Sequence, residues 1–398
     1  MPIVFVHGVA TRMSPDYARA VALRDALFKE TALAGIVEST SSVVVTNPYW
    51  GGCGVTFAWD HASVPGKKYE SFGTSQELAS DLLANTVDTL PNDLDTTLVT
   101  IARTSPQSAI DVLFGMTAFD DTQIDPVALV KLASQALAYF ERHPTPAWLS
   151  EVTTDMVFID RLRLAIDEEV LAAPPATETF GTTDLVGALK TAAMRVAQVA
   201  GDLIAGYVRA NTETLVAHLR PALDARITSF IGDVFVYLNQ RGTPTSQGAI
   251  VTTVAEAIEA AARSTANRKR DPIIVVAHSL GGEIAYDVLT HFRPDLCCDV
   301  LVTVGSQVAL FEEMKLFGAS DHTLVGPKPV VPKPPGVKCW INVYDSHDIL
   351  SYVAAPVFTD VQDYHFDTGK TVLGAHSAYF LRPTFHRRLN ARLRAALQ

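Results

Sequence analysis

The chain has 398 residues, of which 48% are hydrophobic and 19% are charged, so it can form a sizeable core and is not a disordered chain. Its 43 acidic residues outnumber its 32 basic ones and give a formal net charge of −11. This charge argues against nucleic acid as a partner, because binding along a phosphate backbone needs a positive surface.

The first predicted element is an apolar strand over residues 3–6. The segment is too short and too uncharged for a signal peptide, so we expect a cytoplasmic protein. Similar β-branched runs recur at residues 43–45, 273–276, 300–304 and 340–344. They are continuous rather than alternating, as expected of strands that helices cover on both faces, and helical patterns follow several of them. The sequence therefore predicts an α/β fold with a doubly wound, mostly parallel sheet.

The middle of the chain has a helical character instead. Apolar residues recur at steps of three and four over residues 185–207, which predicts an amphipathic helix packed against other helices. Prolines divide the region into several shorter helices. We therefore expect a large, mainly helical insertion over residues 65–225, between two parts of an α/β core at residues 1–64 and 226–398.

Two further functional classes are disfavoured. The most apolar stretch, residues 192–208, contains Arg195 and Asp202 and does not predict a transmembrane segment. The four cysteines are too few for a disulfide framework, and the adjacent Cys297 and Cys298 have no second Cys/His pair at metal-like spacing. We therefore expect neither a metal site nor a cofactor.

The most informative motif surrounds Ser279, where an apolar strand runs into the sequence Ala-His-Ser-Leu-Gly-Gly and a helical pattern follows at once. The small residues Ala277 and Gly281 allow the strand and the helix to approach each other closely. Such a turn exposes a hydroxyl at the start of a helix, where the N–H of Leu280 can stabilise developing negative charge. We predict that Ser279 is a nucleophile, with His278 as a supporting residue.

A second oxyanion donor is expected for a nucleophilic serine. The first predicted strand ends in His7-Gly8-Val9. Gly8 lets the backbone turn, so that the N–H of Val9 can face that of Leu280 across the reacting carbonyl, with His7 and Gly8 in support. The glycine-rich segment that begins at Trp50 makes this residue a candidate for the lining of the pocket.

The acid that orients the base is expected after the serine, at the end of a later strand. The strand at residues 340–344 is followed by Asp-Ser-His-Asp, which supplies two candidates. Asp345 directly follows the strand and can instead brace the loop. Asp348 lies three residues further on, where it can reach back toward the serine. We favour Asp348 and keep Asp345 as the alternative.

Four histidines follow this strand and are candidates for the base. His347 adjoins the acid, His365 lies in what looks like a short strand, and His386 belongs to a basic helical pattern that we expect to face solvent. His376 lies in a loop that opens into the final helix, at a distance along the chain that allows one loop crossing from the acid. The sequence therefore favours His376 as the base.

Together these motifs resemble those of the α/β-hydrolase superfamily, in its lipase and esterase branch. The matching segments are residues 6–8, 277–282, 344–348 and 376–379. The resemblance implies an α/β-hydrolase fold in which Ser279, Asp348 and His376 are nucleophile, acid and base. It also places the helical insertion where such enzymes often carry a cap or lid over the site.

Other residues receive no catalytic role from the sequence. The segment at residues 231–238 resembles one that precedes the serine motif in bacterial proteins of this kind, but it suggests no chemistry. Glu283 and Asp287, on the helix after Ser279, are expected to be surface charges.

The sequence thus predicts a serine hydrolase that cleaves small-molecule or lipid-like carboxylic esters through an acyl-serine intermediate, with peripheral lipid contact as an option. A thioesterase or an acyltransferase on the same scaffold stays open, because water or another acceptor can resolve the same intermediate. A further alternative is a non-catalytic scaffold whose helical insertion binds a protein.

Overall fold

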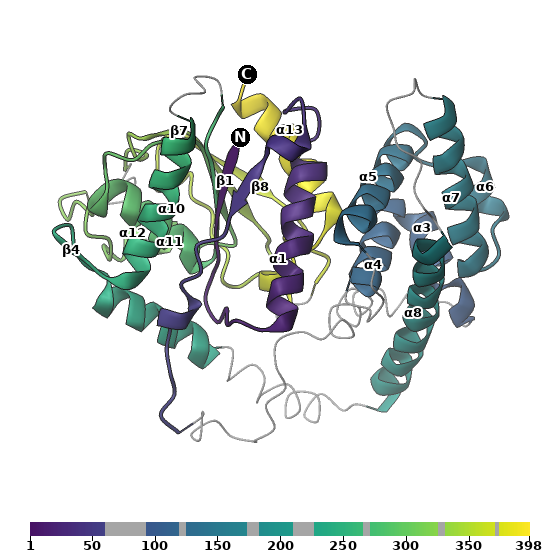
Figure 1. The fold of residues 1–398 in the computed structure, drawn as a ribbon. Coiled ribbons are helices and arrows are strands. Elements are labelled where there is room, and N and C mark those ends of the chain that lie inside the picture. Colours follow the sequence, from purple (N-terminus) through teal and green to yellow (C-terminus); the bar gives the residue numbers. More distant parts are fainter. Residues whose placement is uncertain are drawn as a thin grey trace.

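A computed structural model describes most of the chain (Figure 1). The described residues are 1–59, 93–118, 125–172, 183–209, 227–265, 271–324, 331–370 and 374–398. At the centre is a six-stranded sheet in which every pair of neighbouring strands is parallel. Across the sheet, the strands are β2 (Val44–Thr46), β1 (Pro2–Val6), β5 (Ile274–His278), β6 (Cys298–Val304), β7 (Val337–Tyr344) and β8 (Val361–His365). A separate small hairpin pairs β3 (Gly242–Thr243) with β4 (Ser246–Gln247).

Helices cover both faces of this sheet, as Figure 1 shows. One face carries α10 (Ala249–Thr265), α11 (Leu280–Asp287), η6 (Val288–Phe292) and α12 (Val308–Glu313). The other carries η1 (Phe28–Ala32), which continues α1 (Pro15–Leu27), and α13 (Pro383–Ala396). Another helix spans residues 227–240. The short helices are η2 (Thr40–Ser42), η3 (Gly51–Cys53), η5 (Leu94–Thr96) and η7 (Ala375–Ser377).

The continuous apolar character of the strands follows from this double cover. In β1, Val4 and Val6 pack into the core beneath α10 and α11, while Ile3 and Phe5 pack into the core beneath η1 and α13. Because successive side chains of a strand point to opposite faces, both sets must be apolar when both faces are covered. The predicted α/β class with a parallel sheet is therefore confirmed.

The strand order places a switch in direction between β1 and β5. After β1 the chain adds β2 on one side, which forms one edge of the sheet. On the other side, β5 is followed in order by β6, β7 and β8, which forms the other edge. In open α/β sheets, ligands bind beyond the carboxyl ends of the strands at such a switch point. The residues that follow β1 and β5 are His7 and Ser279, which are two of the residues that the sequence selects.

A helical unit, which we define as α3 to α8, lies between β2 and the helix at residues 227–240 in the chain. Its members are α3 (Thr97–Thr104), α4 (Pro106–Ala118), α5 (Pro126–Arg142), α6 (Ala147–Glu151), α7 (Asp155–Ala172) and α8 (Thr183–Arg209). It has a hydrophobic core largely its own, and α4 and α5 pack against η1 and α13 beside the sheet (Figure 1). The predicted boundaries at residues 65 and 225 lie outside the described residues.

Buried carboxylates organise this helical unit and its contact with the sheet. Asp155, at the start of α7, accepts hydrogen bonds from the backbone N–H groups of Leu98 and Val99 in the first turn of α3, at 3.1 and 3.0 Å. Asp111 of α4 accepts a 2.8 Å hydrogen bond from Nε of Arg382, the N-cap residue of α13. The first carboxylate stabilises orphan N–H groups of a helix, and the second ties the unit to the carboxy-terminal helix.

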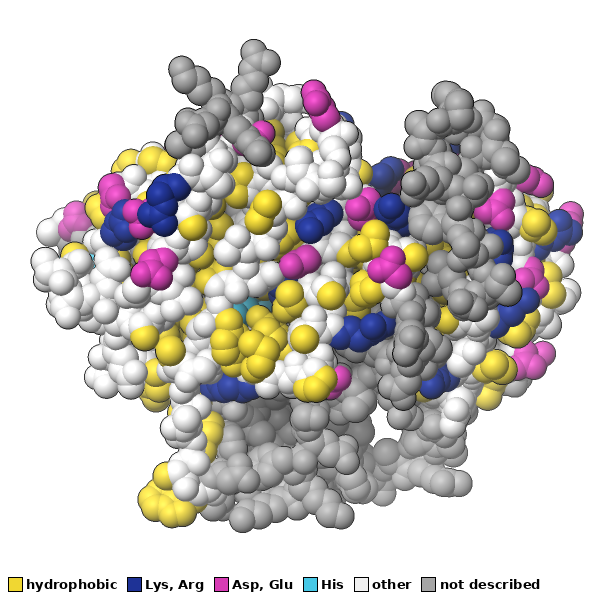
Figure 2. All heavy atoms as spheres, in the orientation of Figure 1, with side chains coloured by type: hydrophobic (Ala, Val, Ile, Leu, Met, Phe, Trp, Pro, Cys, Tyr) yellow, Lys and Arg dark blue, Asp and Glu magenta, His cyan; other side chains and the backbone are white. Residues whose placement is uncertain are grey.

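Charged side chains of both signs are distributed over the surface. On the face drawn in Figure 2, Lys and Arg side chains are interspersed with Asp and Glu, and neither sign forms a continuous area among the described residues. Within the described ranges, every helix is too short or too polar to cross a membrane.

Candidate active site

The turn that carries Ser279 has a strained backbone geometry. Strand β5 ends at His278 and helix α11 begins at Leu280, so Ser279 alone makes the connection. Its backbone has φ 52° and ψ −134°, a left-handed conformation that a side chain disfavours. A 3.0 Å hydrogen bond from the Ser279 N–H to the carbonyl of Val304 holds this turn against β6.

Two glycines allow the backbone to pass close to this serine. A side chain at Gly281 would collide with the carbonyl oxygens of Val6 and His7, so the start of α11 lies directly against the end of β1. A Cβ atom at Gly8 would lie 2.7 Å from Cβ of Ser279, nearer than two carbon atoms can approach. The loop after β1 therefore lies directly against Ser279, as the sequence predicts.

Ser279, His376 and Asp348 form a continuous chain of hydrogen bonds. The Ser279 Oγ lies 2.8 Å from Nε2 of His376. On the other side of the imidazole, Nδ1 lies 2.9 and 3.1 Å from the two carboxylate oxygens of Asp348. With Nδ1 donating to Asp348, Nε2 is left to accept the serine proton. These residues come from three separate parts of the chain, so the juxtaposition is a property of the fold.

The Asp348 carboxylate is itself fixed by two further donors. It accepts hydrogen bonds from the Leu350 N–H and from the Tyr379 hydroxyl, both at 2.9 Å. The Asp348 side chain is fully buried, whereas the His376 side chain retains 18% of its exposure. The Asp348 carboxylate is therefore held in place and shielded from solvent, whereas part of the His376 imidazole is in contact with solvent. Ser279 itself is fully buried, so the expectation that this turn exposes its hydroxyl to solvent is wrong.

The alternative acid, Asp345, has a different environment. One of its oxygens accepts from the His347 N–H at 2.9 Å, and the other accepts from the N–H and the hydroxyl of Thr368 at 2.9 and 2.6 Å. Burial acts to raise the pKa of Asp345, but these hydrogen bonds outweigh burial and leave that pKa below its ordinary value. Asp345 thus braces the loop, and the structure places Asp348 on the imidazole.

The other three downstream histidines lie away from Ser279. His347 and His365 approach Asp345, with nitrogen–oxygen distances of 3.3 and 3.9 Å. His386 was expected on a solvated face, and this expectation is wrong. Its ring is fully buried beside Phe28, and its Nε2 lies 2.9 Å from the carbonyl oxygen of Phe380. Burial lowers the pKa of His386 to about 3, so the ring is neutral.

His7 and Trp50 form a buried support beneath the loop after β1. Their rings stack at 4.6 Å, the Trp50 N–H donates to Nε2 of His7 at 3.0 Å, and the indole N–H donates to the His7 carbonyl at 2.9 Å. The remaining ring nitrogen, Nδ1, donates to the Gly8 carbonyl at 2.8 Å. Burial lowers the pKa of His7 to about 4, which keeps both ring nitrogens in these roles. The pair thereby fixes the turn at Gly8.

His278 holds the loop that carries His376. Its Nε2 donates to the backbone carbonyl of His376 at 2.8 Å, and the centres of the two rings are 4.9 Å apart. Burial is the main reason why the pKa of His278 falls to about 3. A neutral His278 therefore holds the loop that carries His376 without adding a charge next to its imidazole.

The two predicted oxyanion donors occupy suitable segments. Leu280 is the first residue of α11, and the first N–H groups of a helix have no partner within it. Val9 follows Gly8, whose backbone touches Ser279. Both residues thus flank the serine, and their role as donors to a substrate oxygen remains a prediction.

Glu283 and Asp287 were expected at the surface, and the structure overturns this expectation, because both are fully buried. Glu283 accepts from the Gln307 N–H at 2.6 Å and from the Ser306 hydroxyl at 3.2 Å. Burial raises the pKa of Glu283 to about 8, so this side chain is largely protonated at neutral pH. In the sequence, the apolar residues Ile284 and Val288 mark one buried side of this helix. Nothing in that spacing indicates that Glu283 and Asp287 are buried as well.

One group of described side chains has the composition of a metal site. Atoms of Asp345, His347 and Asp367 that could ligate a metal lie within 4.8 Å of one another. Both oxygens of Asp345, however, already accept hydrogen bonds from protein N–H and O–H groups. These bonds account for the cluster, and no step of the chemistry considered below uses it.

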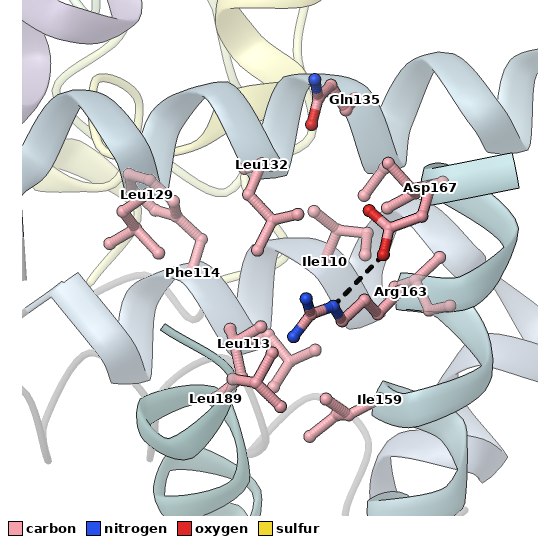
Figure 3. Close-up of a pocket in the computed structure, with 15 residues that line it drawn as sticks. Ile110, Leu113, Phe114, Leu129, Leu132, Gln135, Ile159, Arg163, Asp167 and Leu189 are labelled. Carbon is pink, nitrogen blue, oxygen red and sulfur yellow. Dashed lines mark hydrogen bonds and ion pairs between the residues drawn. The ribbon is translucent and has the colours of Figure 1, made fainter. Parts of the chain in front are cut away.

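The helical unit encloses an apolar cavity of its own between α4, α5, α7 and α8. Figure 3 shows Phe114 and Leu129 among its mainly aliphatic lining, with the ion pair of Arg163 and Asp167 at one side. None of the lining residues belongs to the loops that carry Ser279 and its partners. The cavity is therefore separate from the candidate active site.

Comparisons with protein-family models, with curated proteins and with solved structures gave no significant match. The interpretation of the site therefore depends on the geometry and chemistry of its residues.

Proposed function

We propose that the protein is a serine hydrolase of the α/β-hydrolase superfamily that cleaves carboxylic esters through an acyl-serine intermediate. The observation that carries the proposal is the buried hydrogen-bond chain from Ser279 through His376 to Asp348, with a strained serine at its reactive end. Nucleophile, base and orienting acid within hydrogen-bond reach are the signature of an activated serine. The position at the sheet's switch point adds support.

In the acylation step, the Ser279 Oγ attacks the ester carbonyl carbon while its proton moves to Nε2 of His376. The carbonyl oxygen becomes an oxyanion, which the N–H groups of Val9 and Leu280 stabilise. The tetrahedral intermediate then collapses, the bond to the leaving alcohol breaks, and His376 returns the proton to the alcohol oxygen. Asp348 keeps the imidazole in the required tautomer and stabilises the transient imidazolium.

Deacylation repeats these steps with water as the nucleophile. The water oxygen attacks the acyl carbon while His376 takes a proton from the water. His376 then returns a proton to the Ser279 Oγ as the carboxylic acid leaves. A thiol ester, or an alcohol in place of water, would use the same residues. Release of free acid at the same rate as the alcohol therefore distinguishes hydrolysis from acyl transfer.

Within this proposal, the helical unit corresponds to the cap or lid that such hydrolases often carry as an insertion. We further propose that the substrates are lipid-like esters, and the apolar character of the helical unit supports this choice of substrate. A series of p-nitrophenyl esters of increasing chain length tests it, with activity expected to rise with chain length and at a lipid–water interface. Activity that only falls as the chain lengthens contradicts a lipid substrate and leaves the ester hydrolase proposal intact.

The central test is labelling with a serine-directed fluorophosphonate. We expect the full-length protein to be labelled at Ser279, the Ser279→Ala variant to be unlabelled, and its ester hydrolysis to fall by about 10⁴-fold or more. Ser264→Ala, a substitution of a serine on α10 that only bonds its own helix, is the matched control and should retain labelling and turnover. A folded wild-type protein without label, or full hydrolysis by Ser279→Ala, contradicts the proposal.

A further inference from the structure

A buried carboxylate connects the helix at residues 227–240 to two loops near Ser279. Asp233 has no exposed surface, and its Oδ2 accepts the backbone N–H of Ala10 at 2.7 Å. Its Oδ1 accepts the backbone N–H of Val55 at 2.6 Å. The guanidinium of Arg12 donates to both oxygens, at 3.2 and 2.8 Å. One side chain thus receives four donors from two loops that are far apart in the sequence.

The first of these loops contains the proposed oxyanion donor. Ala10 adopts φ 55°, a left-handed conformation that is uncommon for a residue with a side chain. Such a conformation persists only when the surrounding structure fixes it, and the hydrogen bond from the Ala10 N–H to Asp233 is one such restraint. Ala10 directly follows Val9 in the chain. The backbone N–H that Asp233 binds is therefore one residue after the Val9 N–H, the proposed oxyanion donor.

The helix that carries Asp233 is in turn tied to α11, the helix that begins directly after Ser279. One turn further along residues 227–240, the Tyr237 hydroxyl donates to Asp287 of α11 at 2.8 Å, and Arg241 donates to the same oxygen at 2.8 Å. Asp287 is fully buried at the end of α11, the helix that begins at Leu280. The two predicted oxyanion donors are therefore connected through one rigid path of two helices and two carboxylates.

From this geometry we propose that Asp233 is a positioning residue that sets the place of the Val9 N–H relative to the Leu280 N–H in the oxyanion hole. The inference rests on the proposed hydrolase function. It gives the segment at residues 231–238 a role that its sequence alone does not suggest. Oxyanion donors act through preorganisation, since their dipoles must already point at the charge that develops in the transition state. A displaced Val9 therefore lowers turnover more than substrate binding.

The experiment compares Asp233→Ala and Asp233→Asn with the wild-type protein, with fluorophosphonate titration to count active sites before each assay. We expect kcat per titrated site to fall by about 10- to 100-fold in Asp233→Ala, below the 10²- to 10³-fold loss of a whole donor, with KM changed less than about threefold. Asp233→Asn keeps one acceptor oxygen but loses the charge facing Arg12, so its fall should be smaller.

Asp155→Asn is the matched control. Asp155 is also buried and also accepts two backbone N–H groups, but it lies in the helical unit. We expect Asp155→Asn to lower the stability of the protein without changing kcat per titrated site. A second measurement is hydrogen exchange of the Ala10 amide, which should become faster in Asp233→Ala and stay unchanged in Asp155→Asn.

The outcomes separate the two proposals. If kcat per titrated site stays at the wild-type value in Asp233→Ala while only the titrated fraction falls, Asp233 is merely structural and the inference is wrong. Unchanged exchange of the Ala10 amide also overturns it. A wild-type protein that takes up no fluorophosphonate instead contradicts the hydrolase proposal itself, and the positioning role falls with it.

Discussion

Ser279 occupies a backbone conformation that costs of order 1–3 kcal/mol for a residue with a side chain. Hydrogen bonds on both sides of the turn maintain it, from Ser279 to Val304 and from the Gly282 N–H to the Ser279 carbonyl at 2.8 Å. A fold that needed only a connection between β5 and α11 would place glycine here. The strain instead aims the hydroxyl at His376, which is why we connect the turn with chemistry.

At this scale we predict opposite effects for the two neighbouring acids. Asp348→Asn removes the charge that holds the His376 tautomer, so kcat should fall by about 10³- to 10⁴-fold while the protein stays folded. Asp345→Asn weakens the bonds to Thr368 and His347, so it should lower the melting temperature and leave most of kcat. Steady-state ester hydrolysis and thermal unfolding of both variants measure this. The reverse ranking in kcat would assign the acid role to Asp345.

The residue scale also separates what local sequence can predict from what it cannot. The turn at Ser279 was predictable, because its small neighbours and flanking apolar runs lie within a dozen positions. The choice between Asp345 and Asp348 depends on how the loop after β7 folds, and that is set by Thr368 and Tyr379, which come later in the chain. Asp233 was not predictable as an anchor, since its partners lie more than 170 positions earlier.

At the scale of elements, strand prediction succeeded where burial on both faces forces continuous apolar sequence, as in β1 and β5. Strand β8, at the sheet's edge, has the sequence Val-Gln-Asp-Tyr-His and is only partly buried, so its pattern is weaker. Helix α13 was predictable as a helix, but its basic residues suggested an exposed face. The sequence does not reveal that the helical unit binds Arg382 there through Asp111, or that His386 is buried against Phe28 of η1.

We predict that the buried ion pair of Asp111 and Arg382 contributes more to the stability of the interface between the helical unit and α13 than the exposed pair there does. Asp111→Ala leaves the Arg382 guanidinium buried without its carboxylate, so the free energy of unfolding should fall by about 3 kcal/mol or more. Arg387 of α13 and Glu141 of α5 form a second pair in the same interface, but both are partly exposed. Glu141→Ala should therefore cost less than about 1 kcal/mol. Urea unfolding of the two variants measures the difference.

Equal effects of Asp111→Ala and Glu141→Ala would contradict this ranking and place the interface's stability in its apolar contacts. The comparison also bears on the active site, because Arg382 lies six residues after His376 in the same segment. A large loss in Asp111→Ala would mean that the helical unit stabilises the part of the chain that supplies the base.

At the scale of the whole molecule, the described core contains several ionisable side chains whose pKa values are shifted toward the neutral form. His7, His278 and His386 have pKa values lowered to between about 3 and 4, chiefly by burial. Glu283 and Asp155 have pKa values raised to about 8 and about 6, again chiefly by burial. His7, His278 and Glu283 lie next to the candidate site, so these buried groups add no charge there at neutral pH.

These pKa values make the stability dependent on pH with a defined sign. Below pH 6.5 the unfolded chain protonates its histidines, whereas the folded chain keeps the buried rings neutral, so stability is lost as the pH falls from 6.5 toward 3. The two raised acids act in the opposite direction. Above their unfolded pKa values the unfolded chain releases a proton that the folded chain keeps, so each removes stability as the pH rises.

We therefore predict that His386→Phe reduces the acid sensitivity of the protein. Phenylalanine can keep the aromatic contact with Phe28 but cannot take up a proton in the unfolded state. Between pH 6.5 and 4.5, one histidine with a folded pKa of about 3 removes about 2 kcal/mol of stability, at about 1.4 kcal/mol per pH unit once protonation is complete. Urea unfolding at both pH values should show a fall in stability that is smaller in the variant by this amount. An equal fall in both proteins would mean that His386 is protonated in the folded state, which its complete burial argues against.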